Sequence, residues 1–140
     1  MCSIRTAESV CAGHPDKLAD QIADQILDDI LYDDKAARVA VEVMAAGRRI
    51  IVTGEITTNH RPRIRESVRT ALARSGYSPL GILIYVWTRR QSSDINAGVT
   101  TSLEARGGDS SAFALQGAGD QGTVYGYATA ATCLLYTSPS

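Results

Sequence analysis

The sequence has few cysteines and no long hydrophobic run. Cys2, Cys11 and Cys133 are widely spaced and form no paired-thiol motif, which argues against a disulfide framework and against a thiolate metal site. The longest apolar run, residues 80–87, is far too short to span a bilayer, and the N-terminus lacks a basic and then apolar signal region. We therefore predict a cytoplasmic protein with reduced thiols and no membrane partner.

The sequence also lacks an excess of charge of either sign. Its 14 basic and 15 acidic residues give a net charge of -1, so it has nothing like the cationic surface of a nucleic-acid-binding protein. With 44% hydrophobic residues in 140 positions, the chain is long enough for one globular domain with a core. We expect small-molecule partners and no nucleic acid.

Hydrophobic periodicity predicts an α+β fold. Apolar residues recur at intervals of three and four over the first segment, which is typical of an amphipathic helix, and Pro15 suits its first turn. The predicted elements are a helix over 15–31, a hairpin of strands over 38–44 and 48–58, a helix over 61–75 and a buried strand over 81–88. An earlier strand over 3–10 is left open, and Tyr85 and Trp87 are predicted to be core residues. We predict a two-layer sandwich with both helices on one face of a mainly antiparallel sheet.

The first predicted helix carries an aspartate at every fourth residue from Asp16 to Asp28. Like charges at this spacing repel each other. Arginines at the same spacing on the second predicted helix, from Arg61 to Arg69, could face the aspartates across a helix pair. The alternative, two separately solvated faces, is equally good, because exposed ion pairs contribute only about 0 to 1 kcal/mol each.

Residues 14–17, His-Pro-Asp-Lys, bring four different chemistries into the first turn of the first predicted helix. A helix start has backbone N–H groups without helical partners and a partial positive charge, so it suits phosphate oxygens. Lys17 adds a cation, Asp16 could hold Mg²⁺ against a phosphate, and His14 could donate to an oxygen that gains charge as a bond breaks. The alternative is structural, since an aspartate at a helix start is ordinary dipole chemistry and Lys17 could be solvated.

A glycine-rich stretch, GAGDQG at 117–122, is a second candidate for ligand binding. Glycines let a ligand approach the backbone, but their spacing here matches neither the dinucleotide fingerprint nor the Walker loop. Asp120 suits a hydroxyl or ammonium group, and a tight turn is the alternative. Glu42 and Glu55 each interrupt an apolar strand, so each either faces solvent on an open sheet face or is buried against a cation.

Together these segments resemble the S-adenosylmethionine synthetase family. The matching stretches are AESV, GHPDKLADQIADQILD, ARVAVE, GEITT, QSSDINAGV and GAGDQGTVYGYAT, in the family's order, within residues 3 to 131. The resemblance implies a reaction of ATP with L-methionine, in which the sulfur attacks the ribose 5′ carbon and expels triphosphate, later cleaved to pyrophosphate and phosphate. It also implies K⁺, a pair of Mg²⁺ ions in each site, and a homodimer or homotetramer with active sites shared between subunits.

The resemblance implies a role for each matching position. His14 and Lys17 would be catalytic and would bind the triphosphate of ATP. Asp16 would be a ligand of Mg²⁺, and Glu42 would be a ligand of K⁺. Glu55 would bind methionine.

The later segments carry both matches and departures from the family. Asp120 would bind ATP and methionine, and Glu8 could reach the nucleotide or metal site. Ala12 stands where the family usually has glutamate, Ser93 where it has proline, and Ala97 where it has a methionine-contacting glutamine. The change at Ala97 places methionine affinity, or the choice of sulfur substrate, in question.

The resemblance also divides the chain. We expect residues 1–103 to be the N-terminal domain with the start of a mobile loop, 104–131 to be the loop and the beginning of a middle domain, and 132–140 to be a non-native tail. Such a piece holds only part of a site, so we expect no turnover from it alone. Two alternatives are another nucleotide-dependent transferase or phosphohydrolase, and a non-catalytic nucleotide-binding or regulatory relative.

Overall fold

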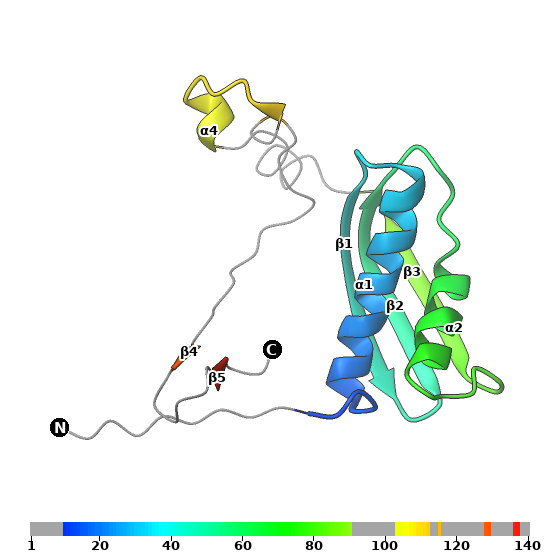
Figure 1. The fold of residues 1–140 in the computed structure, drawn as a ribbon. Helices are drawn as coiled ribbons and strands as arrows, with labels where there is room; N and C mark the ends of the chain where they lie inside the picture. Colours follow the sequence, from blue (N-terminus) through cyan, green and yellow to red (C-terminus); the bar gives the residue numbers. More distant parts are fainter. Residues whose placement is uncertain (1–9, 91–102, 113–114, 116–127, 130–135, 138–140) are drawn as a thin grey trace.

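The computed structural model describes residues 10–90, 103–112, 115, 128–129 and 136–137. In its main body two helices lie side by side on one face of a three-stranded sheet (Figure 1). The elements are α1 (Pro15–Asp33), β1 (Arg38–Ala46), β2 (Arg49–Thr57), α2 (Ile64–Arg74), β3 (Leu83–Arg89), α4 (Leu103–Arg106), β4 (Ala128–Thr129) and β5 (Tyr136–Thr137). This arrangement confirms the predicted α+β class and the placement of both helices. No helix in the described ranges is long and apolar enough to cross a membrane.

Helix α1 forms where the apolar periodicity predicts it. Pro15 occupies the first turn, where its missing N–H costs no helical hydrogen bond. The apolar residues at four-residue spacing face the sheet, and Ile22 and Ile26 have no exposed surface. The helix ends at Asp33, and the backbone N–H of its C-cap residue, Asp34, still donates to the carbonyl oxygen of Ile30.

The sheet is mixed, with strand order β1-β2-β3. Strands β1 and β2 form the predicted antiparallel hairpin, in which Val43 lies opposite Val52. Strand β3 runs parallel to β2, because helix α2 carries the chain back to the end of the sheet at which β2 starts. The second strand pair therefore differs from the mainly antiparallel arrangement that the sequence suggested.

The hydrophobic core lies between the helices and the sheet. The inward side chains of α2, Ile64, Val68, Ala71 and Leu72, are all buried, as the sequence predicts. They meet the apolar stripe of α1 and the inward residues of the strands, which include Val39, Ile50, Val52 and Ile56. Alternation along each strand turns every second residue away from this core, onto the face that we call the open face.

The open face carries large apolar side chains. Trp87 is 63% exposed and Tyr85 is 38% exposed, and their rings stack with centroids 5.8 Å apart. The prediction that these two residues belong to the core was wrong. Strand β3 is an edge strand whose open-face residues lie away from both helices, so only alternate residues such as Val86 pack against the core.

The aspartates of α1 and the arginines of α2 do not form the hypothesised charge pairing. Within residues 10–90 no ion pair joins the two stripes, and the residues of both are exposed. The antiparallel helices instead meet through glutamines, since Arg74 donates to Gln25 over 2.9 Å and the Ser75 hydroxyl donates to Gln21 over 2.6 Å. The alternative of separately solvated faces is therefore correct.

Asp34 fastens the end of α1 to the segment that follows β2. Its carboxylate accepts hydrogen bonds from the Asn59 backbone N–H at 2.8 Å, the Thr58 hydroxyl at 2.9 Å and the Ala36 backbone N–H at 3.1 Å. These bonds, that from Asn59 first, hold the pKa of Asp34 below its ordinary value because they favour the charged form.

This lowered pKa predicts an acid-dependent loss of stability. The carboxylate stabilises the folded state above the unfolded pKa of about 4, and this contribution is lost as pH falls through the lower folded pKa. We expect Asp34→Ala to be less stable than the wild type at pH 7, with the difference shrinking below about pH 4. Urea unfolding of both proteins from pH 7 to pH 2.5 measures this difference, and a difference that stays constant with pH would contradict the prediction.

Candidate functional site

The first turn of α1 is organised by the side chain of His14. This residue is the N-cap, and its Nδ1 accepts a hydrogen bond from the Asp16 backbone N–H at 3.2 Å. Its own backbone N–H donates to Cys11 at 2.9 Å, and its carbonyl oxygen accepts from the Leu18 N–H at 2.8 Å. The backbone around His14 is thus held on both sides.

The cap determines which nitrogen of His14 can act on a ligand. An Nδ1 that accepts a hydrogen bond carries no proton, so in the neutral ring the proton is on Nε2. His14 is exposed, which leaves Nε2–H as a donor for an anionic oxygen. Asp16 is also exposed and Lys17 is half-buried, so a carboxylate and an ammonium group lie beside this donor in the chain.

The same cap leaves fewer backbone N–H groups open for a phosphate than the sequence suggested. Pro15 has no N–H, and the N–H of Asp16 is already bonded to His14. Two of the groups that an open helix start would present are therefore absent or occupied. The side chains of the turn, together with the partial positive charge of the helix, must supply most of any affinity for phosphate.

Glu55 is a buried carboxylate on the open face. It is 8% exposed, and its Oε1 accepts from Nε of Arg89 at 3.0 Å and lies 3.0 Å from Nη2 of the same guanidinium. The sequence left open whether Glu55 faces solvent or meets a cation, and the structure selects the cation. Sequence reasoning did not identify Arg89, because its partner lies on another strand.

Glu42, the other glutamate that interrupts an apolar strand, is exposed. It lies on β1 directly opposite Thr53 and turns to the open face. Within the described ranges no group of three or more histidine, cysteine or acidic residues could hold a metal ion. Glu42 and Asp16 thus each offer a single carboxylate. Such a site fits an ion whose other ligands come from water, from a bound ligand or from other parts of the protein.

The structure does not bring all of these residues together. Pro15 borders a small cavity with Gly47 and Ile50, at the hairpin end of the sheet. Glu55 lies five residues along β2 from Ile50, about 17 Å away at the usual rise of a strand, and on the face opposite α1. The first turn of α1 and the Glu55 carboxylate therefore lie on opposite faces of the sheet within one copy of the chain, and Figure 1 shows α1 on one face of that sheet.

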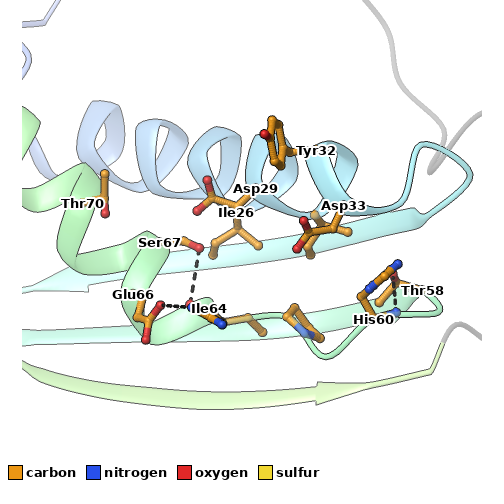
Figure 2. Close-up of a pocket in the computed structure, with 13 residues that line it drawn as sticks. Ile26, Asp29, Tyr32, Asp33, Thr58, His60, Ile64, Glu66, Ser67 and Thr70 are labelled. Atoms are coloured by element: carbon orange, nitrogen blue, oxygen red, sulfur yellow. Dashed lines mark hydrogen bonds and ion pairs between the residues drawn. The ribbon is translucent and has the colours of Figure 1, made fainter.

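A larger cavity of about 430 Å³ contains none of the predicted site residues. Figure 2 shows it between the C-terminal half of α1, the segment after β2 and the first turns of α2. Asp29 and Asp33 border it from α1, and the Glu66 carboxylate lies 3.6 Å from the Arg63 guanidinium at its α2 side. Several of its polar groups have local partners, as in the hydrogen bond from the His60 backbone N–H to the Thr58 hydroxyl.

Some predicted positions lie outside the described residues. They are Glu8, Asp120, the glycine-rich stretch at 117–122, Ser93 and Ala97, and residues 3–9 of the earlier strand that the sequence left open. The roles of all the predicted site residues and the division of the chain into three segments stay predictions.

Most of this chain matches known proteins. Residues 3–96 match the model of the S-adenosylmethionine synthetase N-terminal domain. The chain is 46% identical over 131 residues to an S-adenosylmethionine synthase of Finegoldia magna, and 47% identical over 131 residues to one of Kosmotoga olearia. Each match covers 89% of this chain and 33% of the relative. The chain therefore spans about a third of the length of these relatives.

A solved structure has a similar fold. It is described as an unusual S-adenosylmethionine synthetase from Campylobacter jejuni, with a TM-score of 0.57 and 38% identity over 64% of this chain and 27% of that one. Two helices on one face of a mixed sheet thus define an α+β domain of the kind found in S-adenosylmethionine synthetases. The chain belongs to the S-adenosylmethionine synthetase family.

Proposed function

We propose that this chain is the N-terminal domain of a methionine adenosyltransferase, which makes S-adenosylmethionine from ATP and L-methionine and releases phosphate and pyrophosphate. Family membership supports the reaction. The observation that carries the assignment of the site is the His14 cap, which leaves an Nε2–H donor beside a carboxylate and an ammonium group. Because the chain spans about a third of its relatives, we propose that it does not turn over alone.

In this proposal the first turn of α1 binds the triphosphate leaving group. The Nε2–H of His14 donates to the oxygen that gains charge as the C5′–O bond breaks, and Lys17 neutralises neighbouring phosphate oxygens. Asp16 holds Mg²⁺, which supplies charge neutralisation for the triphosphate, and Glu42 holds K⁺. One carboxylate at Asp16 is enough, because Mg²⁺ in such sites takes most of its ligands from phosphate and water.

Methionine binding at Glu55 requires a competition with Arg89. The Arg89 guanidinium already lies 3.0 Å from the Glu55 carboxylate, and its side chain is 80% exposed. The methionine ammonium group therefore takes the place of the Arg89 guanidinium at Glu55. Arg89 moves into solvent when methionine binds. We place Asp120 beside the nucleoside and methionine, as the family resemblance implies.

A homodimer or a larger homo-oligomer completes the site in this proposal. The sheet separates Glu55 from the first turn of α1, so one bound ATP and methionine cannot contact both within one copy. The open face offers a surface for the second copy, since Met44 is 54% exposed, Leu83 51% and Trp87 63%. Exposed apolar side chains gathered on one face favour association.

Binding of magnesium tripolyphosphate to the 140-residue chain tests the phosphate site. We expect His14→Ser to weaken binding about 10-fold to 100-fold, because it removes one hydrogen bond to a charged group. Serine caps helices well, so this variant keeps the cap that His14→Ala loses. Asp16→Asn should weaken binding when Mg²⁺ is present and not when it is chelated.

Titration calorimetry with tripolyphosphate measures these changes. Asp20→Asn is the matched control, because it makes the same chemical change one turn further along α1 at an exposed position. Equal affinity of the wild type and His14→Ser would remove His14 from the site. A response of Asp16→Asn that does not depend on Mg²⁺ would remove the metal role of Asp16.

A second candidate function is a non-catalytic nucleotide-binding or regulatory relative of the synthetase. The ion pair between Arg89 and Glu55 favours it, because the carboxylate proposed to bind methionine already has a cation. The complete product of the source gene distinguishes the two candidates when it is incubated with ATP and methionine. Formation of S-adenosylmethionine supports the enzyme, and nucleotide binding without that product supports the relative.

A further inference from the structure

Tyr77 contacts the residue that immediately precedes His14. Its hydroxyl donates a hydrogen bond of 2.8 Å to the carbonyl oxygen of Gly13, 64 positions earlier in the chain. We propose that Tyr77 is a positioning residue, which holds the segment from Cys11 to Lys17 so that His14 and Lys17 face the triphosphate. The inference rests on the proposed function of this segment, which we call the phosphate turn.

The backbone of Tyr77 is well suited to act as a fixed support. Helix α2 ends in a Schellman motif, in which the Tyr77 N–H donates to Leu72 at 2.9 Å and the Gly76 N–H donates to Ala73 at 3.1 Å. Gly76 has φ of +82°, the left-handed conformation that this motif requires. The backbone of Tyr77 is therefore held at the end of a helix whose apolar face is buried.

The segment after Tyr77 is fastened to the β1–β2 hairpin. Arg48 donates from Nε to the Gly81 carbonyl oxygen at 3.1 Å and from Nη2 to the Leu80 carbonyl oxygen at 3.2 Å. The chain between α2 and β3 is thus tied at both ends. The hydrogen bond from the Tyr77 hydroxyl to Gly13 connects the phosphate turn to this segment.

The phosphate turn borders a small cavity. A cavity of about 190 Å³ lies between Gly13 and Pro15 on one side and Ala45, Gly47 and Ile82 on the other. Tyr77 also borders this cavity, so its ring lies beside the turn as well as its hydroxyl. The hydrogen bond from Tyr77 therefore restrains the turn at a place where it is open to the surface rather than enclosed by the core.

Gly13 allows this contact because it has no side chain. A Cβ at position 13 would lie 3.1 Å from the Tyr77 hydroxyl oxygen and 3.7 Å from the nearest ring carbons. Only the hydroxyl contact is tighter than ordinary van der Waals distance. Gly13→Ala should therefore disturb the turn when the hydroxyl is present, and much less when it is absent.

Tyr77→Phe tests the proposal because it removes the hydroxyl and keeps the ring. We expect the affinity of the 140-residue chain for magnesium tripolyphosphate to fall about fivefold, the usual effect of one lost hydrogen bond. Hydrogen exchange at the amides of His14 and Leu18 should become faster, with no change at Ile26 in the middle of α1. Tyr32→Phe is the matched control, because it makes the same change at a position that is 88% exposed near the other end of α1, and we expect no change in either measurement.

The double variant separates positioning from a general structural role. Gly13→Ala should weaken binding in the wild type and add little to Tyr77→Phe, because both changes act on one contact. A tyrosine with only a structural role would lower the thermal midpoint and leave the affinity of the folded protein unchanged. Equal affinity of Tyr77→Phe and the wild type therefore overturns the proposal.

The two measurements also separate this proposal from the proposed function. If the wild type does not bind magnesium tripolyphosphate, the phosphate site is wrong. In that case hydrogen exchange at the His14 amide still tests whether Tyr77 restrains the phosphate turn. Unchanged exchange in Tyr77→Phe overturns this restraint, and faster exchange supports it.

Discussion

Gly54→Ala is expected to lower the free energy of unfolding by about 3 to 5 kcal/mol, the largest effect of any exchange of glycine for alanine in β2 or the hairpin turn. Gly54 lies on the central strand with φ of +126°, which side chains rarely tolerate. A Cβ there would lie 2.9 Å from Cα of Val41 and closer still to the carbonyl oxygen of Ala40. These atoms belong to the backbone of β1, so they cannot move without breaking the hairpin.

Gly47→Ala is the matched control for this prediction. Gly47 also has a positive φ, +58°, but a Cβ there would meet no atom within 4 Å. We therefore expect a cost of about 1 to 2 kcal/mol, from backbone strain alone. Urea unfolding with an unchanged slope measures both values. Equal losses in the two variants would show that contact with β1 contributes nothing.

The effect of Gly54→Ala should extend to the proposed methionine site. Gly54 pairs with Val41 of β1 and Thr88 of β3. The next residue along β2 is Glu55, and the next along β3 is its partner Arg89. Displacing β2 from β1 at this point therefore moves the carboxylate of Glu55 relative to its partner guanidinium.

Ile22→Ala is expected to lower the free energy of unfolding by about 3 to 4 kcal/mol. Ile22 has no exposed surface and lies on α1 between the sheet and α2. Its truncation removes buried methyl and methylene groups and leaves a cavity, since the close-packed layers can collapse only in part.

Leu80→Ala is the control for the core prediction. It removes a similar amount of apolar side chain at a position that is 83% exposed, so we expect a change within about 0.5 kcal/mol. Chemical unfolding followed by circular dichroism measures both. A loss below about 1 kcal/mol for Ile22→Ala would contradict the packing of α1 on the sheet.

The helices and the hairpin could be predicted because their signals are local. The apolar residues of α1 recur over neighbouring turns, and the β-branched runs on either side of Gly47 indicate two strands that follow each other. The exposure of Trp87 could not be predicted this way. An apolar residue at an edge strand looks the same in the sequence whether or not a layer covers it.

The candidate site was predictable to the extent that its residues are consecutive. His14, Asp16 and Lys17 lie within one turn of helix, so the residue types alone suggest chemistry that acts on a phosphate. The sequence predicted open backbone N–H groups at this turn, and the His14 cap occupies one of them. Whether a side chain turns back to cap its own helix depends on a rotamer that the sequence does not determine.

The sequence by itself determined the α+β class, the amphipathic faces of both helices and the chemical types gathered at residues 14–17, because each depends on residues within a few positions of one another. Only the tertiary structure decided that Arg89 meets Glu55, 34 positions away, and that Tyr77 meets Gly13, 64 positions away. It also decided that the sheet stands between the first turn of α1 and Glu55. Contacts of this kind depend on how the chain crosses over and on which strands become neighbours, and local periodicity carries no information about either.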